Sequence, residues 1–119
     1  MQRWFLFSLL SLSPVVAMAA PMPFACNMRA MTPAERTQHA ALSHQLLRGV
    51  QEKRELPNGY ALRLSPDQWL PAARWSALER NCCPFFAFGL ASDANGGPVW
   101  LRITGAPGAK AFLREEFGL

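Results

Sequence analysis

The sequence lacks several features that mark common functional classes. It has no run of like charges, and its 12 basic and 8 acidic side chains are spread along 119 residues. A nucleic-acid-binding protein usually gathers its basic residues into one stripe, so we expect no nucleic-acid partner. The redox motif C-x-x-C and the haem motif C-x-x-C-H are absent as well. Their absence argues against a C-x-x-C redox site and against a covalently attached haem.

The sequence also lacks an apolar run long enough to cross a bilayer, which takes about 20 residues. The run Trp4–Leu12 is shorter, follows the basic start Met1–Arg3, and precedes the small residues Ala17–Ala19. This order is typical of a cleavable secretory signal. We therefore expect residues 1–19 to be a signal peptide and the mature protein to be periplasmic or secreted, with no membrane span. The alternatives are an uncleaved N-terminal anchor and a start at Met22, which would make the protein cytoplasmic.

The rest of the chain has room for one domain. Prolines favour an extended segment over 20–31, and we expect a single domain over 32–119. Thr32 and Glu35 form a capping-box pattern, and Gly49 follows as a stop signal. Helices are expected over 33–48, over 71–82 and from about 107 to 117; strands are expected over 50–56, 60–64, 85–90 and 99–103. This order, α-ββ-α-ββ-α, predicts an α+β fold with a four-stranded antiparallel sheet packed with helices.

A weak internal repeat accompanies this order. The segment Gly59–Pro66 resembles Pro98–Gly105, and each precedes an expected helix. The likeness suggests two ββα units that share one sheet.

The chain contains three cysteines, Cys26, Cys82 and Cys83. In an oxidising compartment thiols tend to pair, so one interpretation is a structural disulfide between Cys26 and either Cys82 or Cys83. Such a disulfide would stabilise the domain by about 3–4 kcal/mol. It would leave one cysteine unpaired, and the spacing does not say which one.

A second interpretation is a site for a soft metal ion, because thiolates bind Cu(I), Zn(II) and other thiophilic ions well. The candidate ligands are Cys26, Cys82 and Cys83, with the thioether of Met28 near Cys26. Adjacent residues on a helix point about 100° apart, which is poor for chelation. At a helix end before Pro84 the two cysteines have the freedom to turn toward each other.

Each candidate also has a purely structural explanation. Cys82 shares a helix face with buried-type residues and is expected in the core, which leaves Cys83 as the more exposed thiol. Met28 is expected to serve packing more often than ligation. His39 and His44 lie five residues apart on different helix faces and are expected to be solvated. No histidine is placed beside a cysteine as a base, so the sequence favours binding over catalysis.

A further candidate is an apolar patch. Trp100 alternates with the inward-facing residues of its strand, and together with Tyr60 and Phe85 it would form a surface for a protein partner or ligand. If helices cover both faces of the sheet, the same residues are core.

The segment Leu78–Phe86, which reads LERNCCPFF, resembles small uncharacterised bacterial proteins that carry an ERxCCPF segment. The likeness extends to Ala25–Met28, Thr32–Arg36 and Val99–Gly105. This resemblance implies no particular activity. The leading hypothesis from the sequence is a small exported protein that binds a soft metal ion or a thiol-reactive compound through its cysteines. The rival hypothesis is a structural or interaction module with a Cys26 disulfide and core cysteines.

Overall fold

The structure is a computed structural model that describes residues 11–15 and 24–119. Most of the expected signal peptide, 1–19, lies outside the described residues, as do positions 20–23. In the part of the chain that is described, no helix is long and apolar enough to cross a membrane.

The order of elements confirms the α+β class and the expected alternation of helices and hairpins. Along the chain the elements are η1 (Met28–Ala30), α1 (Pro33–Arg48), β1 (Glu52–Leu56), β2 (Gly59–Leu64), η2 (Pro66–Gln68), α2 (Trp69–Cys82), β3 (Phe86–Ser92), β4 (Val99–Gly105) and α3 (Ala109–Phe117). The two η elements are single turns of 3-10 helix.

Local sequence sets the ends of the first two helices. The hydroxyl of Thr32 accepts a hydrogen bond from the Glu35 amide, and the Glu35 carboxylate accepts one from the Thr32 amide, which completes the expected capping box of α1. Helix α2 begins at Trp69, two residues earlier than expected. Pro71 is tolerated there because it lies in the first turn, where backbone amides need no acceptor within the helix.

The four strands form one antiparallel sheet in the order β1-β2-β4-β3. The two hairpins therefore join through β2 and β4 at the centre. In that pair Leu62 lies opposite Leu101. These two leucines are also equivalent positions in the internal repeat of the sequence. The register is therefore the one expected for two hairpins related by a two-fold axis.

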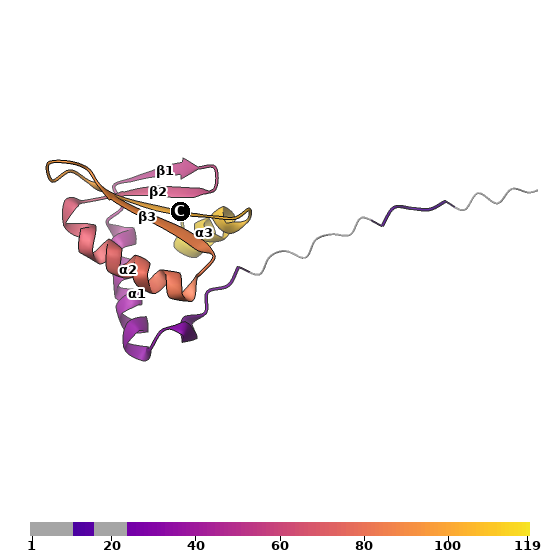
Figure 1. Ribbon diagram of the computed structural model, residues 1–119, viewed down its shortest axis with the longest axis horizontal. Helices are drawn as coiled ribbons and strands as arrows, with labels where there is room; N and C mark the ends of the chain where they lie inside the picture. Colours follow the sequence, from indigo (N-terminus) through magenta and orange to yellow (C-terminus); the bar gives the residue numbers. More distant parts are fainter. Residues whose placement is uncertain (1–10, 16–23) are drawn as a thin grey trace, which may run out of the picture.

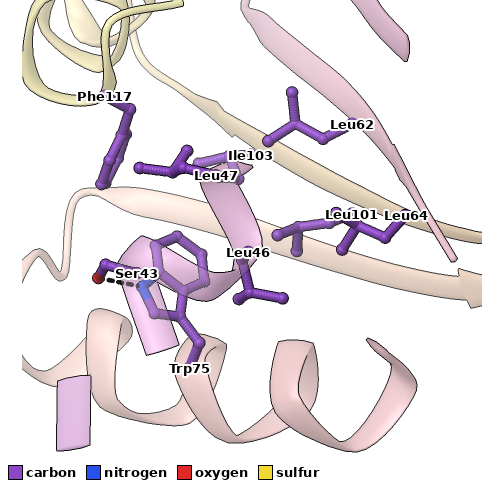
Figure 2. Close-up of a pocket in the computed structure, with 9 residues that line it drawn as sticks. All are labelled: Ser43, Leu46, Leu47, Leu62, Leu64, Trp75, Leu101, Ile103 and Phe117. Carbon is purple, nitrogen blue, oxygen red and sulfur yellow. Dashed lines mark hydrogen bonds between the residues drawn. The ribbon is translucent and has the colours of Figure 1, made fainter. Parts of the chain in front are cut away.

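The three helices of the described residues lie on the same face of the sheet, and α1 and α2 cross each other below it in Figure 1. The core fills this interface. Trp75 of α2 is 3% exposed, and its indole donates a 2.8 Å hydrogen bond to the Ser43 hydroxyl of α1 (Figure 2). Leu62, Leu101 and Ile103 of the sheet line the same pocket as the indole (Figure 2). Burying these side chains is the main favourable term for folding.

The expected apolar patch of Tyr60, Phe85 and Trp100 does not form. Tyr60 is 1% exposed on the helix-covered face, where its hydroxyl accepts a hydrogen bond from Arg114 of α3. Phe85 precedes β3 and packs against Phe86 and other aromatic rings. Trp100 points to the opposite face, because adjacent side chains of a strand alternate between faces.

Candidate functional site

The three cysteines meet at the C-terminal end of α2. Pro84 disfavours the helical conformation at the residue before it, and Cys83 has φ −124° and ψ 69°. This turn places the sulfur atoms of Cys82 and Cys83 only 3.7 Å apart. The sequence analysis predicted that the pair has the freedom to turn together before Pro84, and the structure shows the two sulfurs close to each other.

A disulfide joins Cys26 to Cys83, with their Cα atoms 4.6 Å apart. It ties the N-terminal segment to the end of α2. Two further contacts hold that segment: the Asn27 amide donates a 2.7 Å hydrogen bond to the Cys82 carbonyl, and the Phe24 ring packs edge-on against Phe85. The structural hypothesis left the partner of Cys26 open, and the structure assigns it to Cys83.

A buried polar pair lies beneath the cysteines. Glu79 of α2 is 1% exposed, and its carboxylate contacts Nε2 of His39 from α1. An ionised Glu79 only accepts hydrogen bonds, so in that state Nε2 of His39 is the donor. The His39 ring stacks on Trp75 with a centroid separation of 6.3 Å. A charged group this deep in a core requires a partner, and His39 supplies it.

Cys82 is the free cysteine, and its side chain is fully buried. Its sulfur lies 3.4 Å from the Glu79 backbone carbonyl and 3.8 Å from the Glu79 carboxylate. Burial, and then the charge of Glu79, raise the pKa of the Cys82 thiol to about 11. The thiol is therefore protonated at neutral pH, which makes it a poor nucleophile.

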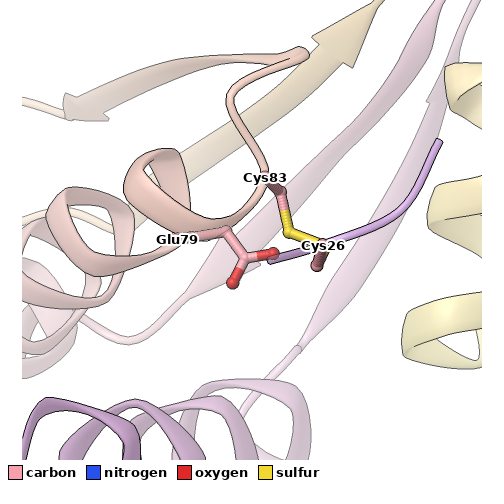
Figure 3. A group of neighbouring side chains, drawn as sticks. All are labelled: Cys26, Glu79 and Cys83. Carbon is pink, nitrogen blue, oxygen red and sulfur yellow. A yellow bond between two sulfur atoms is a disulfide. The ribbon is translucent and has the colours of Figure 1, made fainter. Parts of the chain in front are cut away.

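Two groups of possible metal ligands overlap at Glu79. One group is Cys26, Glu79 and Cys83; the other is His39, Glu79 and Cys82, and the ligand atoms within each group lie within 4.8 Å of one another. Figure 3 shows the Glu79 carboxylate beside the Cys26–Cys83 disulfide. We refer to these five residues, Cys26, His39, Glu79, Cys82 and Cys83, as the cysteine site.

The sequence-predicted residues have different outcomes. Cys26, Cys82 and Cys83 come together, and Cys82 is core as expected. Cys83 is 1% exposed, so the expectation that it is the more exposed cysteine was wrong; its disulfide draws it inward. Met28 lies on η1 with 42% of its surface exposed, and its part in metal binding remains a prediction. His44 is exposed, as expected.

His39 and Glu79 were missed by sequence reasoning. His39 was expected to be solvated, but it is 9% exposed because it shares the inner face of α1 with Leu46. The signal was available, since positions 39, 42 and 46 recur at helical spacing. Glu79 precedes Cys82 and Cys83 by three and four residues, which places it on their side of α2. The contact between the two residues joins positions 40 apart, and no local pattern encodes it.

Comparison with known proteins gave no match to a family model, to a curated protein or to a solved structure.

Proposed function

We propose that the protein, once its disulfide is reduced, binds a thiophilic metal ion at the cysteine site, and that Zn(II) fits this site best. The observation that carries the proposal is the 3.7 Å separation of the Cys82 and Cys83 sulfur atoms. Two sulfur ligands of a tetrahedral zinc ion lie about 3.8 Å apart, because each Zn–S bond is about 2.3 Å long. The Cys82 sulfur shares one ligand group with the buried imidazole of His39 and the carboxylate of Glu79, and the Cys83 sulfur shares a second group with Glu79 and Cys26. Imidazole and carboxylate are the other ligand types that zinc accepts.

The mixed donor set distinguishes zinc from Cu(I). Three cysteines and a methionine alone would favour a soft, sulfur-only ion. The structure adds His39 and Glu79 to the three sulfurs. Imidazole and carboxylate ligands suit Zn(II), a borderline ion, better than Cu(I). We assign Cys82, Cys83 and His39 as ligands, and either Glu79 or Cys26 as the fourth.

The redox state of the Cys26–Cys83 disulfide controls whether the cysteine site can bind zinc. In the oxidised protein the Cys26–Cys83 disulfide removes two of the three thiolates. A dithiol reductant transfers two electrons and two protons to the disulfide, which gives two thiols and leaves the reductant as its own disulfide. Zinc then displaces the thiol protons, as metal binding to cysteine requires, and the imidazole hydrogen of His39 moves from Nε2 to Nδ1 so that Nε2 is free to bind the ion. An exported location, which we also propose, would favour the oxidised form.

The raised pKa of the Cys82 thiol disfavours reaction of this one cysteine with a thiol-reactive compound, the other half of the sequence-based hypothesis. A fully buried, protonated thiol is neither accessible nor nucleophilic. A metal cation differs from an alkylating compound, because it offsets the charge of the thiolate that it creates.

A competition titration with a chromophoric zinc chelator tests the proposal. We expect the reduced protein to bind one zinc ion per chain and the oxidised protein to bind none. H39A should weaken zinc binding about a hundredfold or more, since loss of even an outer-shell partner costs 10–100-fold. The matched control is H44A, which removes the exposed histidine of the same helix. Equal zinc affinity for H39A and H44A would contradict the assignment.

The fourth ligand is decided by C26S. This variant cannot form the Cys26–Cys83 disulfide, so its Cys83 thiol is free without reductant. If Glu79 is the fourth ligand, C26S binds zinc as tightly as the reduced native protein. If Cys26 is the fourth ligand, C26S binds zinc weakly whether or not reductant is present.

A structural role for the disulfide rests on a separate observation, the docking of the N-terminal segment. The disulfide closes a loop with a sequence separation of 57 residues. Closing such a loop stabilises the folded state by about 4 kcal/mol in the chain-entropy model. In the oxidised protein the disulfide therefore holds the N-terminal segment against α2 and makes Cys26 and Cys83 unavailable as metal ligands.

A further inference from the structure

The face of the sheet opposite the helices carries an arrangement of charge that the cysteine site does not use. The register places Glu52, Arg63, Trp100 and Ala91 side by side in one row across the sheet. The next row holds Arg54, Ala61, Arg102 and Gly89. We call these two rows, with Leu56 at their edge, the open face. All three helices contact the other face, so among the described elements none covers this one.

The open face is basic and rich in arginine. Its three arginines, Arg54, Arg63 and Arg102, stand against one acidic residue, Glu52. Arginine presents a planar fork of donors that matches a carboxylate, and it is enriched with tryptophan in protein interfaces. The open face thus combines arginine and tryptophan, two of the residue types that most often dominate the binding energy at protein interfaces.

Two of these side chains already hold each other in place. The Arg54 guanidinium lies 4.4 Å from the centroid of the Trp100 ring, and its Nε donates a 2.8 Å hydrogen bond to Glu52. A guanidinium stacked in this way loses less side-chain entropy when it binds a carboxylate.

A shallow trough of about 310 Å³ runs over this face. It is lined by Arg54, Leu56, Ala61, Ala91, Trp100 and Arg102. Small residues of β2 and β3 form its floor, so a polypeptide backbone can approach the sheet closely. The trough is open, and that shape suits a macromolecular segment better than an enclosed small molecule.

Arg63 adds a second indication. Its Nε is shielded from solvent and has no hydrogen-bond acceptor among the described residues. The nearest carboxylate, Glu52, lies 3.9 Å from its Nη1. An N–H group without an acceptor is costly when buried. The Arg63 side chain as a whole is 42% exposed, so a partner's carboxylate can pair with the Nη groups of this guanidinium.

We propose that the open face binds an extended, acidic segment of a partner protein, with Asp or Glu at alternate positions. The two rows of arginines lie two residues apart along the strands, which is roughly 7 Å. Alternate side chains of an extended peptide have the same spacing and point to the same side. Two acidic side chains of the segment therefore meet the Arg63 row and the Arg54–Arg102 row in register.

The composition of the face disfavours the other anionic macromolecules. Single-stranded nucleic acid is held by several aromatic side chains that stack successive bases, and Trp100 is the one aromatic residue of these rows. Anionic membranes attract clusters of four to eight basic residues, and this face has three. This binding is independent of the proposed zinc site, since the cysteines lie on the helix side of the sheet.

Fluorescence anisotropy tests the proposal with a labelled peptide of alternating glutamate and threonine. We expect the full chain to bind it, and to bind a glutamine–threonine peptide of equal length far more weakly. R54A/R102A should weaken binding about tenfold, as expected for the loss of two exposed charge pairs. The matched control, R48A/R74A, makes the same charge change at exposed positions on α1 and α2 and should bind as the native protein does. Circular dichroism of each variant confirms that the fold is retained.

Three results would overturn the proposal. The first is equal weakening by the two double variants, which would indicate a net-charge effect alone. The second is tighter binding of oligothymidylate or of phosphatidylserine vesicles than of the acidic peptide. The third is failure of the native protein to bind the acidic peptide at low salt, where surface charge pairs are strongest.

Discussion

Replacement of His39 by alanine is expected to be the most damaging single change at the cysteine site. In H39A the carboxylate of Glu79 stays 1% exposed but loses the imidazole that it contacts. Leaving a buried carboxylate without its partner costs about 3–5 kcal/mol. His39 is 9% exposed, so some water reaches the gap, and we expect the low end, about 3 kcal/mol.

That loss is a large part of the free energy of unfolding of a typical domain, which is about 5–15 kcal/mol. For a domain of this size it lowers Tm by roughly 10–20 °C. The assay is urea unfolding followed by circular dichroism, on oxidised protein that a chelator has freed of metal. H44A is the control, and it should stay within about 0.5 kcal/mol of the native protein because its side chain is exposed.

A double-mutant cycle separates the pair from its surroundings. H39A/E79A removes both groups and leaves no unpaired charge, so it should be more stable than the sum of the two single losses predicts. We expect a coupling of about 2–3 kcal/mol between the two positions. If H39A were as stable as H44A, or if the two losses simply added, the Glu79 carboxylate would not depend on His39 and the reasoning would be refuted.

Three further predictions concern the disulfide, the free thiol and the first helix. Reduction of the Cys26–Cys83 disulfide in metal-free protein should lower the free energy of unfolding by about 4 kcal/mol in urea titrations. An unchanged urea midpoint would show that the disulfide does not stabilise the fold. In the oxidised native protein Cys82 should resist iodoacetamide, and it should react fully once urea unfolds the chain. Mass spectrometry measures the labelled fraction, and rapid labelling of the folded protein would contradict the burial of Cys82. The capping-box hydrogen bonds with Thr32 lower the pKa of Glu35 below its ordinary 4.5. Its stabilising contribution is therefore present above pH 4.5 and lost as the pH falls through the lower folded value, so acid should destabilise the native protein more than E35Q. Equal acid sensitivity of the two proteins would show that the charge of Glu35 does not stabilise the fold.

Much of the fold is encoded in short segments of the sequence. The Thr32–Glu35 capping box and Gly49 fix both ends of α1, and alternation in β2 and β4 identifies their inward residues. The start of α2 was placed late because Pro71 reads as a helix breaker unless its position in the first turn is known.

The site was only half predictable. The convergence of Cys82 and Cys83 follows from Pro84, which is adjacent in the sequence. The meeting of His39 with Glu79 depends on how α1 packs against α2. A helical pattern places each residue on a face but does not say which residue of another helix it will meet. Tyr60 and Trp100 were wrongly placed on one surface for another reason: strand alternation puts Tyr60 on the inward face with Leu62, and Trp100 on the outward face.

Native mass spectrometry is the decisive test of zinc binding at the cysteine site and of its dependence on the redox state of the disulfide. The oxidised and the reduced protein are each mixed with an equimolar amount of zinc, and their masses are recorded without denaturation. We expect one zinc ion per chain in the reduced sample and metal-free protein in the oxidised sample. Equal zinc occupancy in both samples, or no zinc in either, would contradict it.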